Sequence, residues 1–393
     1  MDQIDDVLTR GVSAIYPKPE TLELALKSGK KLRVYNGIDP TGELHIGHMV
    51  VLRKLRKLQD LGHDIIVLIG DFTAQIGDPT DKTAARQKLT VQQIEENAKN
   101  YKELIGKILD TSAANLRFLH NQDWTNKLKP VDMLELASHF TFQQLIERDM
   151  FQDRIKNNKE IFLHEFLYPI FQAYDSVSMD VDMEIGGNDQ IFNMLAGRTL
   201  MKKVKNKEKF VMAVKLLTDG VGKKMGKSEG NIISLSDSAE NIFGKVMAYP
   251  DELILIGFEL LTDKTMEEID KLKQTLGKEV NPKDAKAELA YEIVKQLYSQ
   301  EDARAAKENF ENVFSKKKLP ENLEVKEVKK GGLLIDAMVE TGLVSSKNEA
   351  RRLIEQGAVK INGDAINDVN YIYDLAGENI LKVGKLRVLK IKS

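Results

Sequence analysis

The first 235 residues alternate short apolar runs with stretches of helical periodicity, and this alternation constrains the fold more than any other feature. After the first run, for example, Leu55, Leu58 and Leu61 recur at helical spacing. A capping box at Thr90 predicts a second helix that ends near residue 109. The expected strands are residues 32–38, 65–69, 116–119, 179–185 and 210–217. A β-α-β alternation predicts an open, doubly wound parallel α/β sheet, which binds ligands at the carboxyl ends of its strands.

The pattern changes after about residue 234. Residues 237–312 are rich in helical periodicity and in charge, and a basic stretch that contains Pro320 follows them. In the last 63 residues or so, two helical patterns precede short β-like runs. We therefore expect four segments: a large α/β domain (1–235), a helical domain (236–314), a basic linker (315–330) and a small α+β module (331–393).

The composition excludes several classes of protein. The chain has 58 Lys and Arg residues against 60 Asp and Glu, which excludes a uniformly basic nucleic-acid coat but not a local basic surface. It has no cysteine, so disulfides and thiolate metal sites are excluded. The acidic N-terminus is unlike a secretory signal, and no stretch approaches the ~20 apolar residues of a membrane helix. We therefore expect a cytoplasmic protein.

The first candidate motif is a turn that leads from an expected strand into a helix, at residues 35–48. A helix N-terminus favours phosphate because it presents free N–H groups and partial positive charge. His45 and His48 are three residues apart, so they share one helical face and can both donate to a reacting phosphate. Gly47 allows a nucleotide ring to approach the backbone. Taken alone, such a histidine pair is more often structural.

The second candidate motif, Lys-Lys-Met-Gly-Lys-Ser-Glu-Gly-Asn at residues 223–231, follows the last expected strand. Two lysines on a Gly-rich loop can close over a polyphosphate and neutralise the charge that grows in a transition state. A Lys-rich loop is usually only solvated. This one, however, lies where a parallel sheet places its ligands.

Together the two motifs resemble the signatures of class I aminoacyl-tRNA synthetases. His-Ile-Gly-His stands at 45–48 and Lys-Met-Gly-Lys-Ser at 224–228, with Gly226 where the commonest form has Ser. From about residue 30 to 235 the chain resembles tyrosyl-tRNA synthetases. Between the two motifs, the segments that carry this resemblance are residues 76–80, 167–175 and 186–190. The resemblance implies a Rossmann-like catalytic domain that activates tyrosine with ATP.

The resemblance also implies a role for each matching residue. Tyr35 and Asp175 would bind the phenol hydroxyl of tyrosine, and Gln190 would lie near its carboxylate. The residues implied for its ammonium group are Asp78, Tyr168 and Gln172. Those implied in catalysis are His45, His48, Lys224, Lys227, Ser228, Lys82 and Arg86. Those implied in nucleotide binding are Gly37, Asp39, Thr41, Gly47, Gly187, Asp189, Leu216 and Leu217. For Arg86, an exposed basic loop is nearly as good an interpretation.

The chemistry of these residue types agrees with a tyrosine site. A buried phenol hydroxyl needs partners; Asp175 supplies an acceptor, and Tyr35 supplies a hydroxyl that can donate or accept. The same pair favours a phenol over the indole that the related tryptophan enzyme binds. Glu184 stands where many tyrosine enzymes have Gln, a pattern that resembles one bacterial branch and leaves the local hydrogen bonding open.

Residues 334–363 resemble the small RNA-binding domain first described in a ribosomal small-subunit protein. Ser346 is a candidate N-cap, and the residues that would face RNA phosphates from the following helix are Lys347, Arg351 and Arg352. A module that binds protein is the alternative interpretation.

The resemblance implies a two-step reaction in which ATP, accompanied by Mg²⁺, and tRNA(Tyr) are substrates, with no permanently bound cofactor. It also implies a homodimer with its contact in the helices around residues 125–160. Two other classes remain open at this point. One is a small-molecule adenylyltransferase, which would not need the helical and RNA-binding segments; the other is a non-catalytic RNA-binding protein, against which the intact motifs argue.

Overall fold

The computed structural model describes residues 2–80, 89–217, 232–315, 325–344, 346–374, 377–384 and 387–392. The chain divides into two compact units, Met1–Lys307 and Glu308–Ser393. Across these described ranges, no helix has the length and apolar character that a membrane crossing requires.

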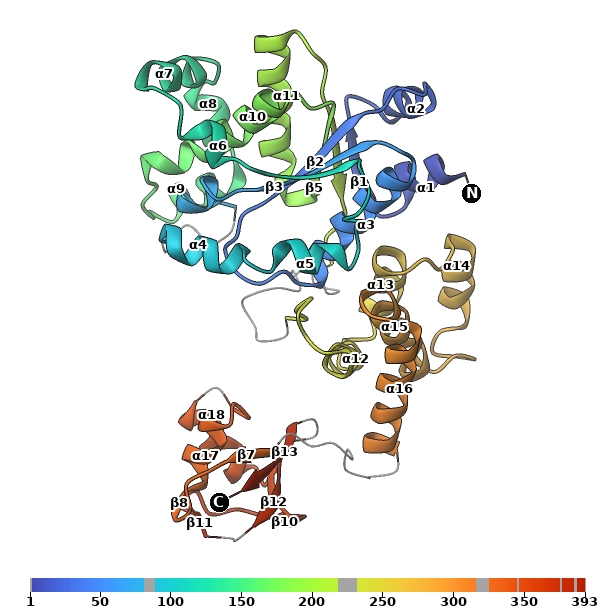
Figure 1. Cartoon of the computed structure of the whole chain (residues 1–393), viewed down its shortest axis with the longest axis vertical. Helices are drawn as coiled ribbons and strands as arrows, with labels where there is room; N and C mark the ends of the chain where they lie inside the picture. The colour runs from blue at the N-terminus through green and yellow to red at the C-terminus, as the bar shows by residue number, and fades with distance from the viewer. Residues whose placement is uncertain are drawn as a thin grey trace. The chain divides into compact units, whose positions relative to one another are not determined.

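A six-stranded sheet forms the centre of the first unit (Figure 1). Its strands are β1 (Val12–Tyr16), β2 (Arg33–Ile38), β3 (Asp64–Ile69), β4 (Leu116–His120), β5 (Met183–Gly187) and β6 (Phe210–Val214). They lie in the order β1-β6-β5-β2-β3-β4, and all neighbours are parallel except β1 and β6. The strand order reverses between β2 and β5, which makes the cleft above their carboxyl ends the expected ligand site.

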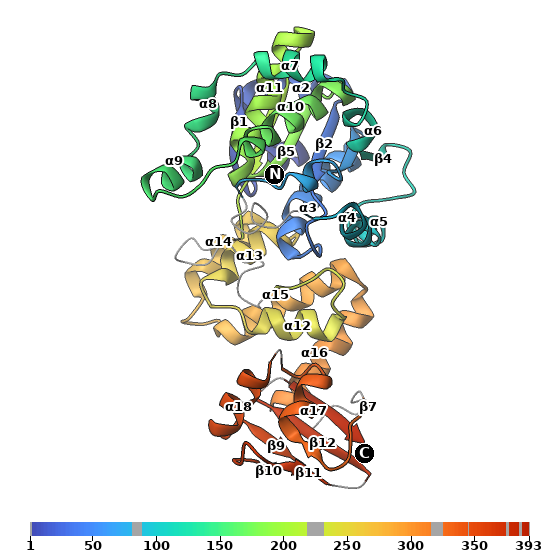
Figure 2. The same ribbon diagram turned by 90° about the vertical axis from the view of Figure 1, so that its left-hand side faces the viewer.

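Helices cover both faces of this sheet. The amphipathic helix α3 (Ile46–Asp60) contacts β2, β3 and β5 and buries the apolar side chains at 52, 55 and 58. Helices α10 (Tyr168–Met179) and α11 (Ile191–Lys205) pack together on the opposite side of the sheet in Figure 1. The other helices before β5 are α1 (Gln3–Thr9), α2 (Pro19–Lys27), α4 (Val91–Ala98), α5 (Tyr101–Gly106), α6 (Gln122–Thr125), α7 (Pro130–Ser138), α8 (Phe142–Ile146) and α9 (Asp149–Lys156). Figure 2 shows α8 and α9 at the periphery of this unit.

The structure corrects three expectations about these elements. The helix expected from Thr90 to about residue 109 is two helices, α4 and α5, because the chain leaves helical geometry at Asn100. The strand expected at 179–185 begins only at Met183, since α10 continues through Met179 and ends at Asp180, whose φ is 51°. The sheet is not wholly parallel, because the unforeseen edge strand β1 runs antiparallel to β6.

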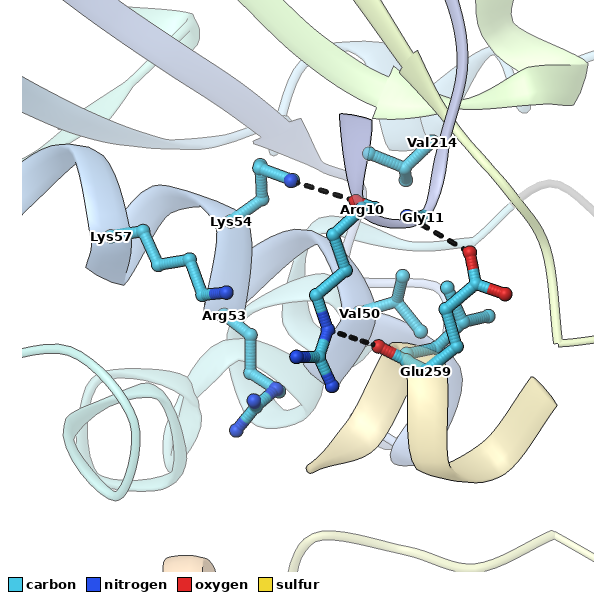
Figure 3. Close-up of a pocket in the computed structure, with 9 residues that line it drawn as sticks. Arg10, Gly11, Val50, Arg53, Lys54, Lys57, Val214 and Glu259 are labelled. Atoms are coloured by element: carbon cyan, nitrogen blue, oxygen red, sulfur yellow. Dashed lines mark hydrogen bonds between the residues drawn. The ribbon is translucent and has the colours of Figure 1, made fainter. Parts of the chain in front are cut away.

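The rest of the first unit is helical, as expected after residue 236. Its helices are α12 (Ala239–Met247), α13 (Leu253–Leu261), α14 (Met266–Thr275) and α15 (Pro282–Leu297), and α16 (Gln300–Ser315) crosses the boundary between the units. Arg10 ties α13 to the sheet: its guanidinium donates to Glu259 O and Thr262 O, each at 2.7 Å (Figure 3). These bonds satisfy carbonyl groups at the C-terminal end of α13, which helices leave unpaired.

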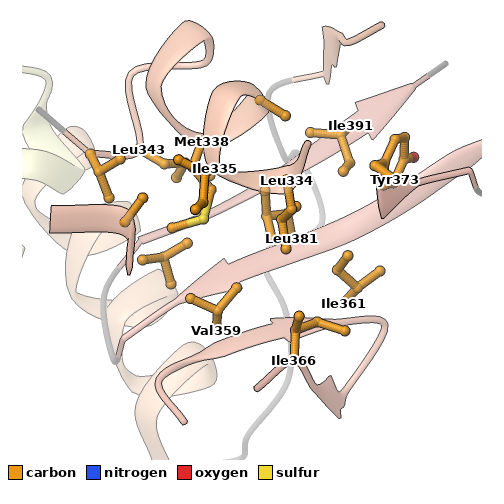
Figure 4. Packing of buried hydrophobic residues seen from close by; sticks show 14 of the residues in the cluster. Leu334, Ile335, Met338, Leu343, Val359, Ile361, Ile366, Tyr373, Leu381 and Ile391 are labelled. Atoms are coloured by element: carbon orange, nitrogen blue, oxygen red, sulfur yellow. The ribbon is translucent and has the colours of Figure 1, made fainter. Parts of the chain in front are cut away.

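The second unit is a small α+β module. Its helices are α17 (Leu334–Glu340) and α18 (Lys347–Glu355), and its strands are β7 (Val325–Glu327), β8 (Gly332–Leu333), β9 (Val359–Ile361), β10 (Asp364–Ala365), β11 (Ile372–Tyr373), β12 (Glu378–Val383) and β13 (Arg387–Lys392). The main sheet has the order β10-β9-β12-β13-β7. Met338, Leu381 and Ile391 are among the fully buried residues of its core (Figure 4). Strand β7 lies within the stretch expected to be a linker, where it pairs parallel with β13.

Candidate active site

The reversal of strand order between β2 and β5 gathers most of the site residues that the sequence indicated. Segments that follow the strands contribute Asp39 after β2, Asp78 after β3 and Gln190 after β5. Helix α10, which lies over the same end of the sheet, contributes Tyr168, Gln172 and Asp175. One hydrogen bond joins Tyr168 to Asp39, and another joins Gln190 to Asp78.

Tyr35 and Asp175 form the buried end of this site. Asp175 Oδ1 accepts a hydrogen bond from Trp124 Nε1 at 2.8 Å, and its Oδ2 accepts one from Asn121 Nδ2 at 3.2 Å. The Tyr35 hydroxyl lies 2.9 Å from Ser176 Oγ. Tyr35 also packs with Trp124 in one apolar cluster. A carboxylate and a hydroxyl between apolar walls suit a flat ring that carries a terminal hydroxyl.

Burial sets the protonation of both groups. It raises the pKa of Asp175 well above its usual range, and the hydrogen bonds from Trp124 and Asn121 oppose that rise. Burial, together with the charges of Glu184 and Asp175, raises the pKa of the Tyr35 phenol. Tyr35 therefore keeps its proton at neutral pH and is available as a hydrogen-bond donor.

A second group of side chains offers acceptors for a cation. Tyr168 donates to Asp39 Oδ2 at 2.8 Å, which holds Asp39 on the amino-acid side of the site. Asp78 Oδ2 accepts from Gln190 Nε2 at 2.6 Å. Gln172 Oε1 is buried without a hydrogen-bond partner among the described residues, although its Nε2 donates to Glu184 at 2.9 Å. Carboxylates beside an unsatisfied carbonyl oxygen form a suitable site for an ammonium group.

Sequence reasoning missed several residues of this site. Asn121 and Trp124 follow β4 directly, so the rule that ligands bind at the carboxyl ends of strands could have found them. Arg148 had no such signal, because it lies among peripheral helices. Its Nη2 nevertheless donates to Thr80 Oγ1 at 2.6 Å and lies 3.8 Å from Asp78 Oδ1.

The histidine motif caps helix α3. His45 is the N-cap residue rather than a member of the helix, and its Nδ1 accepts from Gly47 N at 3.1 Å. His48 Nδ1 accepts from His45 N at 3.1 Å, and the two ring centroids are 4.1 Å apart. A neutral ring that accepts at Nδ1 carries its proton on Nε2, which leaves Nε2–H as the donor. A Cβ atom at Gly47 would lie 2.9 Å from the His45 ring, so only glycine permits this arrangement.

The structure does not describe the residues of the second motif. Lys224, Lys227 and Ser228 lie outside the described residues, and so do Lys82 and Arg86. Just beyond the second motif in the sequence, Ile233 and Ser234 lie beside the histidine turn: Ile46 N donates to Ile233 O at 2.9 Å, and His45 forms a β-bridge with Ser234.

The residues expected to bind the nucleotide lie in this turn and at or just after the carboxyl ends of β2, β5 and β6. Thr41 N donates to Asp39 O at 2.8 Å, and Asn97 Nδ2 donates to Pro40 O at 2.8 Å, which fixes the turn after β2. Gly37 is the residue before the last of β2, Gly187 ends β5 and Asp189 follows it. Leu216 and Leu217 follow β6, and Leu217 is buried. Within the ranges that the structure describes, no three His, Asp or Glu side chains gather closely enough to hold a metal ion.

In the second unit, the three basic residues expected to face RNA are exposed on α18. Ser346 caps the helix as expected, because its side chain accepts from Glu349 N at 3.2 Å. Lys347 pairs with Asp336 at 2.8 Å, and Arg351 bonds to Asn348 at 3.3 Å.

Comparison with known proteins finds strong similarity over the whole chain. Residues 27–315 match the family of tRNA synthetases class I (W and Y), and residues 309–380 match the tyrosine--tRNA ligase SYY-like C-terminal domain. The chain is 42% identical over 388 residues to the tyrosine--tRNA ligase of Thermotoga maritima, which covers 98% of this chain and 96% of that protein. It is 45% identical over 402 residues to that of Carboxydothermus hydrogenoformans, which covers 98% and 97% of the two chains.

Solved structures share the fold of the first part of the chain. A truncated mitochondrial tyrosyl-tRNA synthetase from Aspergillus nidulans superposes with a TM-score of 0.65 at 20% identity, covering 79% of this chain and 94% of that one. The tyrosyl-tRNA synthetase of Archaeoglobus fulgidus, solved with L-tyrosine, gives a TM-score of 0.61 at 24% identity, covering 78% and 100%.

Proposed function

The chain belongs to the class I tRNA synthetases of the tryptophan and tyrosine group, and we propose that the residues gathered between β2 and β5 carry out its reaction. It is a tyrosine--tRNA ligase. The enzyme activates L-tyrosine with ATP to tyrosyl-adenylate and pyrophosphate, and then transfers tyrosine to the 3'-terminal ribose of tRNA(Tyr). We assign substrate binding and charge stabilisation in these two steps to individual residues.

The amino-acid side of the site would bind tyrosine along its length. Asp175 accepts from the substrate hydroxyl, and Tyr35 donates to it. Asp78, Tyr168 and Gln172 hold the ammonium group, for which the unpaired Gln172 Oε1 is the clearest support. Gln190 lies near the carboxylate. The buried pair of Tyr35 and Asp175 is the observation that carries the choice of tyrosine, since an amino acid that lacks the hydroxyl would leave the proton of the buried Tyr35 hydroxyl without the acceptor that the substrate supplies.

The first step needs alignment and charge stabilisation rather than a protein nucleophile. The tyrosine carboxylate is already ionised and attacks the α-phosphorus of ATP, while pyrophosphate leaves. His45 and His48 would donate through Nε2 to the reacting phosphates, since both Nδ1 atoms accept backbone N–H groups. The remaining groups assigned to the polyphosphate, by their place in the sequence motifs, are Lys224, Lys227, Ser228, Lys82 and Arg86. Mg²⁺ would arrive with ATP as part of the substrate.

The nucleoside would lie across the carboxyl ends of β2, β5 and β6. Asp189 and the backbone at Gly37 and Gly187 contact the ribose, and Leu216 and Leu217 flank the adenine. Thr41 and Gly47 belong to the turn beneath the phosphates, where the backbone approaches closely. Asp39, held by Tyr168, stands between the nucleotide and the amino acid.

The second step requires tRNA, in which a terminal ribose hydroxyl attacks the tyrosyl carbonyl and AMP leaves. We assign tRNA contacts to α18 of the second unit, whose exposed Lys347, Arg351 and Arg352 can pair with phosphates. We assign the catalytic domain to residues 1–235, the helical, anticodon-side domain to 236–314, the linker to 315–330 and the RNA-binding module to 331–393.

A homodimer would bury an exposed apolar surface of the first unit. Helices α7 to α9 and the segment before α10 expose Val131, Leu134, Phe142, Ile155, Phe162 and Leu163. Apolar side chains concentrated in this way are typical of a protein interface. We place the enzyme in the cytoplasm, where its tRNA substrate is aminoacylated.

The decisive experiment is ATP–pyrophosphate exchange with each of the twenty amino acids in turn. Exchange that depends on tyrosine alone supports the phenol site and the first step together. Exchange with tryptophan would keep the family and overturn the role of Asp175. An absence of exchange with every amino acid would favour a non-catalytic RNA-binding role.

A further inference from the structure

A buried ion pair lies directly behind the amino-acid site. Lys209, which precedes β6, is completely buried, and its ammonium group donates to Glu184 Oε2 on β5. The same ammonium donates to Ser176 Oγ on α10 at 2.9 Å. Helix α11 leaves space for it only because residue 197 is glycine: a Cβ atom there would lie 2.5 Å from Lys209 Nζ.

Stability alone is a poor explanation for this pair. Removing two charges from water costs several kcal/mol per ion, roughly as much as their attraction returns, and apolar replacements of equal volume are often as stable. Burial accordingly lowers the pKa of Lys209, although the nearby Glu184 raises it. Each member of the pair, however, also forms a hydrogen bond with a side chain of α10: Lys209 with Ser176, and Glu184 with Gln172.

The lysine determines the direction of a hydrogen-bond chain that ends at Tyr35. Ser176 Oγ has one proton to donate, and it lies 2.9 Å from both Lys209 Nζ and the Tyr35 hydroxyl. An ammonium group can only donate, so Ser176 accepts from Lys209 and can pass its own proton to the Tyr35 oxygen. The Tyr35 proton then points towards the substrate. Lys209 also occupies Glu184 Oε2, which would otherwise compete for that proton.

The glutamate orients the other end of the site. Glu184 Oε1 accepts from Gln172 Nε2 at 2.9 Å, and an ionised carboxylate can only accept. This contact fixes which way the Gln172 amide is turned. The carbonyl Oε1 is left buried and unpaired among the described residues, as the ammonium of an amino acid requires.

We propose that Lys209 and Glu184 are positioning residues for tyrosine: the pair makes Tyr35 a donor to the substrate hydroxyl and Gln172 an acceptor for the substrate ammonium. The inference rests on the proposed roles of Tyr35 and Gln172. It assigns a function to Glu184, the position at which the sequence departs from the commoner glutamine, and joins it to Lys209.

The test removes both charges at once, because Lys209→Met alone would leave a buried carboxylate unpaired. Pyrophosphate exchange gives kcat/KM for tyrosine and for phenylalanine. In the double variant Lys209→Met/Glu184→Gln, the ratio of the tyrosine value to the phenylalanine value should fall about tenfold, because about one hydrogen bond to the substrate is lost. The KM for tyrosine should rise severalfold. An unchanged ratio would overturn the proposal.

A double-mutant cycle with Tyr35→Phe separates positioning from structure. If the pair acts through the Tyr35 hydroxyl, adding the double variant to Tyr35→Phe should not lower the tyrosine-over-phenylalanine ratio further. An equal loss in both backgrounds would show that the pair only supports the fold and would overturn the proposal. If Tyr35→Phe itself leaves the ratio unchanged while the wild type still exchanges with tyrosine, it is the assignment of Tyr35 that fails.

Two further variants provide controls. Gly197→Ala keeps both charges, but its Cβ atom would lie 2.5 Å from Lys209 Nζ and 2.8 Å from Ser176 Oγ. It should therefore disturb the contact between these two groups and lower the ratio in the same direction. The matched control is Arg198→Met/Glu208→Gln. It removes an ion pair in which Arg198 Nε lies 2.5 Å from Glu208 Oε1. Arg198 follows Gly197 in the sequence, and Glu208 precedes Lys209. That pair is partly exposed and does not touch the site, so its loss should leave the ratio unchanged.

Discussion

Trp124 Nε1 donates a hydrogen bond to Asp175 Oδ1 over 2.8 Å, and this contact joins the segment that follows β4 to the middle of α10. The indole thereby holds the carboxylate to which we assign the substrate hydroxyl. It also lowers the pKa of Asp175 against the larger effect of burial. In this proposal, the selection of tyrosine depends on a residue that lies 51 positions before Asp175 in the chain.

Replacing Trp124 with Phe should weaken tyrosine recognition while keeping the apolar wall. Leaving a buried acceptor without one of its donors costs roughly 1–3 kcal/mol, so kcat/KM for tyrosine should fall about tenfold. Steady-state pyrophosphate exchange measures this value. Phenylalanine serves as the control substrate, because it makes no bond to Asp175; an equal fall for both amino acids would contradict the role given to Trp124.

Much of the fold could be predicted because its signals are local. The apolar runs at β2 and β3 and the periodicity of α3 follow directly from side-chain spacing. The histidine motif follows the carboxyl end of β2, where a parallel sheet places its ligands. Local signals also explain the errors, since the end of α10 at Asp180 depends on a left-handed backbone conformation that the apolar pattern did not reveal.

The missed parts of the site depend on contacts between distant segments. Lys209 follows Lys207 and Glu208 and looks like one more exposed charge, yet it is completely buried against Glu184. Arg148 lies between the peripheral helices α8 and α9 but reaches Thr80. Nothing in the spacing of either residue identifies its partner, because the partner is brought near only by the folded chain.

Variants of His45 should separate its capping role from its catalytic role. His45→Asn keeps an N-cap acceptor, whereas His45→Ala removes it and should cost about 1 kcal/mol of unfolding free energy. Both lose the Nε2 donor, so the turnover of pyrophosphate exchange should fall by roughly 10²–10³ while the KM for tyrosine changes little. Urea unfolding and exchange kinetics measure the two effects. Full activity in the stable Asn variant would rule out the transition-state role.

His48→Ala and Lys227→Ala should follow the same kinetic pattern. Each removes a donor or a charge that acts on the phosphates, so each should slow the first step far more than it weakens tyrosine binding. Pre-steady-state formation of tyrosyl-adenylate and equilibrium binding of tyrosine give the two quantities. An equal loss in rate and in binding would show that these residues act on the ground state.

A charge placed on the exposed apolar surface should dissociate the proposed dimer. Leu134 is 73% exposed on α7, so Leu134→Glu should leave the fold of a single chain intact. We expect sedimentation to show a shift from dimer towards monomer at micromolar protein, because a buried carboxylate would lack a partner. Leu24→Glu is the control, since Leu24 is 71% exposed on α2, far in sequence from this surface. A monomeric wild type would refute the dimer.

The ion pair of Arg154 and Glu165 should give the first unit a specific dependence on pH. Glu165 is 1% exposed and accepts from Arg154 at 2.5 and 2.8 Å and from Phe162 N at 2.9 Å. Burial alone would raise the pKa of Glu165, but these bonds outweigh it and hold the pKa below the usual 4.5. The stabilisation is therefore present above about pH 4.5 and is lost as the pH falls through the folded-state pKa.

Arg154→Met reverses the sign of that dependence, because burial then raises the pKa of Glu165 above its unfolded value. The variant should be less stable than the wild type by roughly 2–3 kcal/mol at pH 7, and the deficit should shrink towards pH 5 as the carboxylate takes up a proton. Urea unfolding at both pH values measures the deficit. In Arg154→Met/Glu165→Gln no buried charge remains, so its deficit should not change with pH; a pH-dependent deficit in that control would assign the effect to other groups.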